Sequence, residues 1–174
     1  MADNPQAGIH AGLALAASHF VEKMKTRLDG GNYPHGDSDR GTTSIQDATT
    51  IDTPKHEGGN AYVDIVISLS KAPFAWAFEK GSGLHSEEGA GKYPIRPVDK
   101  DWLAFFWPEA QNPDALNYLP DGRVIIGQVM HPGIAAKPYI RPTIVEEREE
   151  IKKILGREFK AQISRGGTVE IIEP

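Results

Sequence analysis

The stretch "VMHPGIAAKPYIRPTI", residues 129–144, contains three prolines and one glycine, yet an apolar residue stands at nearly every other position. It is too rich in proline for a regular helix or strand. It is also too apolar for a solvated loop. Pro138 and Pro142 suit the start of a helix, where a missing backbone N–H costs nothing. The stretch therefore predicts a connection that leads into the last long helix.

That helix is predicted over residues 136–164, and its apolar residues recur at steps of three and four from residue 143 onward. Glu and Lys dominate the opposite side, and Glu146 and Glu147 suit the positive end of the helix dipole. Residues 165–174 form a predicted C-terminal tail in which "TVEII" is a short closing strand. The apolar face consists of Ile144, Ile151, Ile154, Leu155, Phe159 and Ile163.

A second amphipathic helix is predicted over residues 7–28, near the N-terminus. Gly30 and Gly31 end it, and the polar, turn-rich segment 29–47 is predicted to be a flexible loop. The apolar positions of this helix recur at steps of three and four. They are Ile9, Leu13, Ala16, Phe20, Met24 and Leu28.

Residues 48–135 are predicted to form a sheet. In "AYVDIVISL", residues 61–69, apolar and polar positions alternate with a period of two, which indicates a half-buried strand. The preceding "ATTIDTPKH" is its expected hairpin partner through the turn "EGGN", and Pro54 places that partner at a sheet edge. "DWLAFFW" and "GRVIIGQVM" are two further predicted strands, separated by a projecting insertion at 108–121.

This order of elements predicts an α+β fold. We expect residues 1–174 to form a single domain, in which a mostly antiparallel sheet of about four to five strands is packed by the N-terminal and C-terminal helices.

Composition excludes several classes of protein. The 174-residue chain is 39% hydrophobic and 25% charged, which supports an ordinary core. Its net charge of −5 argues against a general nucleic-acid binder, although it allows contact with DNA that passes by. The absence of cysteine excludes disulfides and cysteine-based zinc sites. No stretch is apolar enough to span a membrane, so we expect no membrane partner.

No catalytic, cofactor or metal site is predicted. "EEGAGK" lacks the first glycine of a phosphate-binding loop, and Tyr93 stands where that loop needs Ser or Thr. "DSDRG" lacks the later ligands of a calcium loop. The six histidines show no zinc-binding spacing, and no nucleophile-elbow motif is present. The residues alone therefore single out no catalytic site.

The aromatic residues support a structural role. There are more of them than one side of a small sheet must bury. Some are therefore expected in the core and others at a contact between subunits. The residues concerned are Trp76, Phe78, Trp102, Phe105, Phe106 and Trp107.

Three motifs follow one another in an order that resembles a phage family. The first is "FAWAFEKGSGLH", with Phe78, Glu79, Gly81, Gly83 and His85. The second is "YPIRPVDKDWLAFFW", with Pro94. The third is the opening stretch, which contributes His131, Pro132, Gly133, Pro138, Tyr139, Arg141 and Pro142.

The ordered trio resembles the gene-ten-like tail-component family of lambdoid long-tailed phages, of the HK-ninety-seven type. The likeness covers roughly residues 43–160, with Thr143 standing where the family usually has alanine. It implies a virion protein of the neck or tail without enzymatic activity, assembled in the host cytoplasm as a ring of six-fold or twelve-fold order. The expected partners are further copies of the chain, head-completion or adaptor proteins, and tail terminator and tail tube proteins. Genomic DNA would pass through the ring without sequence-specific binding.

On this hypothesis the opening stretch is a rigid crossover from a strand to a helix. His131, Pro132 and Gly133 make its turn, Ile134 and the Tyr139–Ile140 pair anchor it in the core, and Arg141 is expected to matter more for assembly than for folding. The role of minor tail protein or tail terminator stays open beside tail completion. A small hydrolase and a phage-encoded regulatory binding protein are the alternatives from other classes.

Overall fold

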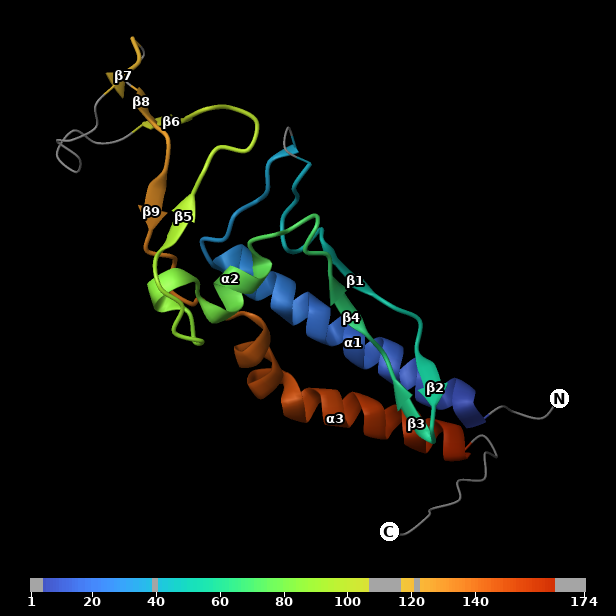
Figure 1. The fold of residues 1–174 in the computed structure, drawn as a ribbon. Helices are drawn as coiled ribbons and strands as arrows, with labels where there is room; N and C mark the ends of the chain where they lie inside the picture. The colour runs from blue at the N-terminus through green and yellow to red at the C-terminus, as the bar shows by residue number, and fades with distance from the viewer. Residues whose placement is uncertain (1–4, 39–40, 107–116, 121–122, 165–174) are drawn as a thin grey trace. The chain divides into compact units, whose positions relative to one another are not determined.

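The computed structural model describes residues 5–38, 41–106, 117–120 and 123–164. Its fold is α+β, as predicted: long helices near both ends of the chain flank small antiparallel sheets (Figure 1). The helical elements are α1 (Pro5–Gly30), α2 (Ala75–Lys80), the 3-10 helix η2 (Gly83–His85) and α3 (Ile140–Ser164).

The strands are short, and every pairing among the described residues is antiparallel. They form separate ribbons of two or three strands instead of the one sheet that was predicted: β1–β4, β2–β3, β5–β9 and β6–β8–β7. Their bounds are β1 Thr49–Ile51, β2 Lys55–Glu57, β3 Asn60–Tyr62, β4 Ile65–Ile67, β5 Tyr93–Ile95, β6 Leu103–Phe106, β7 Asn117–Tyr118, β8 Arg123–Ile126 and β9 Val129–His131.

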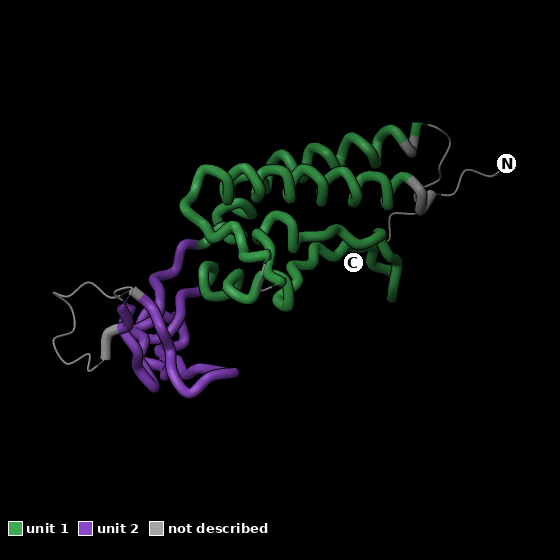
Figure 2. Tube along the Cα trace, turned by 90° about the horizontal axis from the view of Figure 1, so that it is seen from above, with its two compact units in different colours: residues 1–79, 138–174 green, residues 80–137 purple. Residues whose placement is uncertain are grey.

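The chain divides into two compact units, where the sequence predicted a single domain. Unit 1 comprises residues 1–79 and 138–174, and unit 2 comprises residues 80–137 (Figure 2). Unit 1 contains the main hydrophobic core, built around Met24, Leu28, Ile45 and Tyr139. The two units differ in how much apolar surface they bury, and each is described separately below.

In unit 1, α1 and α3 lie side by side along their lengths (Figure 1). Phe20, Met24 and Leu28 are buried, which confirms the predicted apolar face of α1. The predicted face of α3 is only partly correct. Ile154 is buried, whereas Ile144 is 51% exposed and Phe159 is 39% exposed.

The predicted strand 61–69 is divided by a bulge. β1 pairs with β4 and β2 pairs with β3, but the three residues 52–54 face only the two residues 63–64 between these ladders. Such an extra residue interrupts pairing and bends the ribbon. Pro54, which has no N–H to donate, stands in the bulged strand. The hairpin itself is confirmed, and its turn uses Gly58 and Gly59, both at positive φ.

Segment 29–47, predicted as a flexible loop, supplies two anchors of the core of unit 1. The Tyr33 and Ile45 side chains are both buried. Thr43 also donates its N–H to the carbonyl oxygen of Lys71 at 2.8 Å. Because the segment is mostly polar, its sequence did not indicate that Tyr33 and Ile45 would be buried.

Unit 2 contains β5–β9 and the three-stranded sheet β6–β8–β7. The predicted strand "GRVIIGQVM" is two strands, because pairing stops at Gly127 and Gln128 and then resumes with a different partner. Most of the predicted insertion 108–121 lies outside the described residues, apart from the short β7. The predicted closing strand "TVEII" and the C-terminal tail also lie outside them.

Candidate functional site

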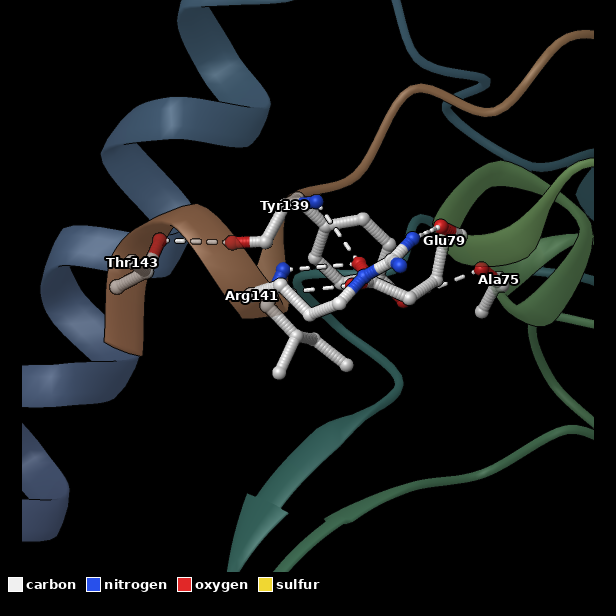
Figure 3. A network of polar contacts seen from close by, with 6 residues as sticks. Ala75, Glu79, Tyr139, Arg141 and Thr143 are labelled. Carbon is white, nitrogen blue, oxygen red and sulfur yellow. Dashed lines mark hydrogen bonds and ion pairs between the residues drawn. The ribbon is translucent and has the colours of Figure 1, made fainter. Parts of the chain in front are cut away.

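The first family-like motif contains Glu79, a charged residue that is only 3% exposed. Glu79 lies in α2, and its carboxylate points at the beginning of α3 (Figure 3). One carboxylate oxygen accepts the N–H of Tyr139 at 2.8 Å and that of Ile140 at 2.9 Å, and the other accepts the N–H of Arg141 at 3.2 Å. The first N–H groups of a helix have no partner within the helix. Glu79 therefore caps α3 from a position sixty residues earlier in the chain.

Arg141 completes this cap. Its Nε donates to a carboxylate oxygen of Glu79 at 2.9 Å, and its guanidinium also donates to the backbone carbonyl oxygen of Glu79. A hydrogen-bonded opposite charge offsets the cost of burying a carboxylate. The Arg141 side chain is nevertheless 48% exposed. The structure thus gives Arg141 a role inside the fold, beside the role in assembly that the sequence predicted.

The charge of Glu79 is held in the ionised form. Burial alone raises the pKa of the Glu79 carboxyl. The hydrogen bonds from Ile140, Tyr139 and Arg141 together outweigh burial, so its pKa lies below the ordinary value of 4.5. The carboxylate also complements the positive end of the α3 dipole.

Tyr139 anchors the same junction with its ring. Its hydroxyl donates to the carbonyl oxygen of Ala75 at 3.3 Å, and its ring meets that of Tyr33 edge-on, with 5.9 Å between centroids. Burial, and then the charge of Glu79, raise the pKa of the Tyr139 phenol, which therefore stays a neutral donor. Phe78 packs edge-on against Tyr33 at 5.3 Å. Tyr139 is thus buried in the core of unit 1, and Ile140 packs against the same core.

Two prolines flank these contacts. Pro138 immediately precedes Tyr139, and Pro142 is the third residue of α3, so both stand where a helix tolerates proline. The helix begins at Ile140 and not at residue 136, because the first turn forms where Glu79 binds the backbone. Thr143 is buried, and its hydroxyl donates to the Tyr139 carbonyl oxygen at 2.7 Å.

In unit 2, the backbone of the first family-like motif forms hydrogen bonds with the backbone of the third. Ser82 donates its N–H to the carbonyl oxygen of Ile134 at 2.9 Å, and Leu84 donates its N–H to that of Pro132 at 2.7 Å. The Ser82 hydroxyl oxygen accepts the N–H of Ile134 at 3.0 Å. Ser82 was not among the predicted site residues, although its place between two motif glycines was a usable signal.

Three motif glycines permit this close approach. Gly133 has φ +96°, and a Cβ there would lie 1.8 Å from the Ser82 carbonyl oxygen. Gly83 has φ +58°, and its Cβ would lie 2.3 Å from the Pro132 carbonyl oxygen. Gly81, at φ +77°, would place a Cβ 2.1 Å from the His85 carbonyl oxygen. Only glycine fits here, on conformational and on steric grounds.

The remaining motif residues lie around this contact or on β5–β9. The His131 Nδ1 accepts the N–H of Gly133 at 2.9 Å, which stabilises the predicted turn. The His131 ring lies 5.4 Å from that of Tyr93. Pro94, in β5, is exposed and faces Met130 across the ribbon. His85 ends η2 and is also exposed.

These contacts are structural in kind: capping, ion pairing and close backbone packing. Within the described ranges, no group of three or more His, Asp or Glu side chains could hold a metal ion. Among the same residues, no helix is long and apolar enough to cross a membrane.

Comparisons with protein-family models, with curated proteins and with solved structures find no match to this chain. The relation to the tail-component family therefore stays a hypothesis, based on the ordered motifs.

Proposed function

We propose that this chain is a structural subunit of a tailed-phage virion, which forms a neck or tail-completion ring between the head-completion complex and the tail. The three ordered motifs support the family. A surface of unit 2 supports assembly into a ring, and this surface is the main observation behind the proposal.

That surface is the β5–β9 ribbon, which exposes apolar side chains on both faces. Tyr93 pairs with His131, Pro94 with Met130 and Ile95 with Val129. Because side chains alternate along a strand, Tyr93 and Ile95 share one face, and Met130 lies on the other. Tyr93 is 39% exposed, Ile95 36% and Met130 48%.

Few hydrophobic side chains are buried among the described residues of unit 2. In its described residues, Val124 is the one hydrophobic side chain that is buried. A ribbon of two strands is marginally stable by itself. Apolar residues on both faces of such a ribbon are typical of a segment that other chains cover. In a ring, each copy would supply that cover to its neighbour through a heterologous contact.

Light scattering coupled to size-exclusion chromatography tests the proposal on the full chain. We expect the mass to rise with concentration to six or twelve times 19.0 kDa. The double variant Ile95→Ser, Met130→Ser should shift the equilibrium toward the monomer. Leu69→Ser, which removes an exposed apolar side chain from unit 1, is the matched control and should leave assembly unchanged.

A chain that stays monomeric at every concentration up to the millimolar range would overturn the proposed ring. Turnover of a substrate by such a monomer would instead favour the hydrolase alternative.

A further inference from the structure

A groove lies at the end of unit 1 where α1 begins and α3 ends. Its volume is about 330 Å³. An apolar cavity of roughly 150 Å³ holds one benzene molecule, so this groove has room for two aliphatic side chains. Phe159 is 39% exposed although it lines the groove. The lining includes Ile9 and Leu13 of α1, Leu155 and Phe159 of α3, and His56 of β2.

His10 gives a second sign that this end of unit 1 is incomplete. The His10 ring lies beside that of His56, with 6.4 Å between the centroids. The His10 Nε2 atom is buried, and no described residue forms a hydrogen bond with it. Buried polar atoms of side chains in folded proteins usually have a hydrogen-bond partner. The missing partner therefore points to a polar group from a segment outside the described residues.

The C-terminal tail, residues 165–174, is close enough to supply that segment. Ser164 ends α3 and follows the groove residue Phe159 by five positions, which is about 8 Å along the helix axis. The five residues 165–169 span up to about 16 Å when extended, so Val169 can return to the groove. Gly166 and Gly167 permit the reversal of direction that this path requires.

The tail also has a suitable pattern of side chains. The stretch "TVEII", residues 168–172, is apolar at Val169, Ile171 and Ile172. In an extended chain, successive side chains point to opposite sides. Val169 and Ile171 therefore share one side, and Glu170 lies on the other. Two aliphatic side chains on one side match the room in the groove.

We propose that this groove binds the C-terminal tail of its own chain. Val169 and Ile171 enter the groove beside Phe159, a backbone group of the tail pairs with His10 Nε2, and Glu170 points to the solvent. The short connection to α3 favours the tail of the same chain over that of another copy, because it gives a high effective concentration. The inference goes beyond the proposed ring and does not depend on it.

Disulfide cross-linking of the full chain tests the docking, because the native chain contains no cysteine. The double variant Leu13→Cys, Ile171→Cys should form an intrachain disulfide under mild oxidation. Leu15→Cys, Ile171→Cys is the matched control, since Leu15 is exposed on the same helix and does not line the groove. We expect the first variant to cross-link about tenfold faster than the control, or more.

Non-reducing electrophoresis at low protein concentration separates the intrachain product from a linked dimer. Equal rates of cross-linking in the two variants would overturn the docking. Linked dimers as the main product of the first variant would show that the groove takes the tail of another copy, which also overturns the proposal.

Limited trypsin digestion followed by mass spectrometry gives a second test, without introduced cysteines. Cleavage after Arg165 requires the chain around this bond to leave its docked position, so Val169→Ser, Ile171→Ser should accelerate it about fivefold or more. Thr168→Ser, Ile172→Ser changes the opposite side of the tail and should leave the rate unchanged. Equal cleavage of the native chain and both variants would contradict the docking. Neither test requires self-association, so a failure of the proposed ring leaves both tests valid.

Discussion

Glu79 illustrates how one residue can join segments that are far apart in the sequence. Its carboxylate is buried, yet three backbone N–H groups and the Arg141 guanidinium surround it. A buried charge is tolerated only with such compensation. Glu79 thereby fixes where α3 begins and binds α2 to it.

Replacement of Glu79 by alanine should destabilise unit 1 strongly. The change leaves the first N–H groups of α3 and the Arg141 guanidinium without their acceptor, at a cost of about 3 kcal/mol. Urea unfolding followed by circular dichroism measures this loss. Glu149→Ala is the control, because its carboxylate is largely exposed, and it should change stability by less than about 0.5 kcal/mol. Equal effects of the two variants would refute the role assigned to Glu79.

The same carboxylate predicts a pH dependence. The pKa of Glu79 in the folded chain is lowered from 4.5. Its contribution to stability is therefore fully present above about pH 4.5 and is lost as the pH falls through the folded pKa. The difference in unfolding free energy between the native chain and Glu79→Gln should thus shrink on acidification below pH 4.5. A difference that stays constant from pH 7 to pH 3 would contradict this assignment.

At the scale of elements, the periodicity of apolar residues predicted the long helices. It could not predict features that depend on residues far away in the sequence, such as a bulge or a helix cap. The steps of three and four in α1 correctly placed Phe20, Met24 and Leu28 in the core. The bulge at 52–54 was not predictable, because a shift of register depends on the partner strand. The beginning of α3 was misplaced for a similar reason, since its cap comes from Glu79 and has no local signature.

The turn after β9 depends on the absence of a side chain at Gly133. Gly133→Ala forces a positive φ on alanine and drives its Cβ into the Ser82 carbonyl oxygen. It should cost about 2 kcal/mol or more, seen as a lower thermal midpoint and faster proteolysis within unit 2. Gly91→Ala is the matched control, because its Cβ would meet nothing within 4 Å and its φ is not positive. Proteolysis of the two variants at the same rate would show that the turn tolerates a side chain.

At the scale of the whole molecule, the two units differ in how many hydrophobic side chains their described residues bury. Unit 1 holds nearly all the buried hydrophobic side chains of the described residues. Unit 2 holds a ribbon with apolar side chains on both faces. The sequence indicated this surplus of apolar and aromatic residues but could not assign it to a unit. Exposed aromatic side chains occur in both units, Trp76 in unit 1 and Trp102 in unit 2. In the proposed ring, a neighbouring subunit would cover the apolar side chains of the β5–β9 ribbon.

Electron microscopy of the concentrated, negatively stained full chain tests the proposed ring most directly. The proposal predicts closed rings with six or twelve copies around an open centre, and their loss in the variant Ile95→Ser, Met130→Ser. Single copies alone at every concentration, or open aggregates without closed symmetry, would contradict it.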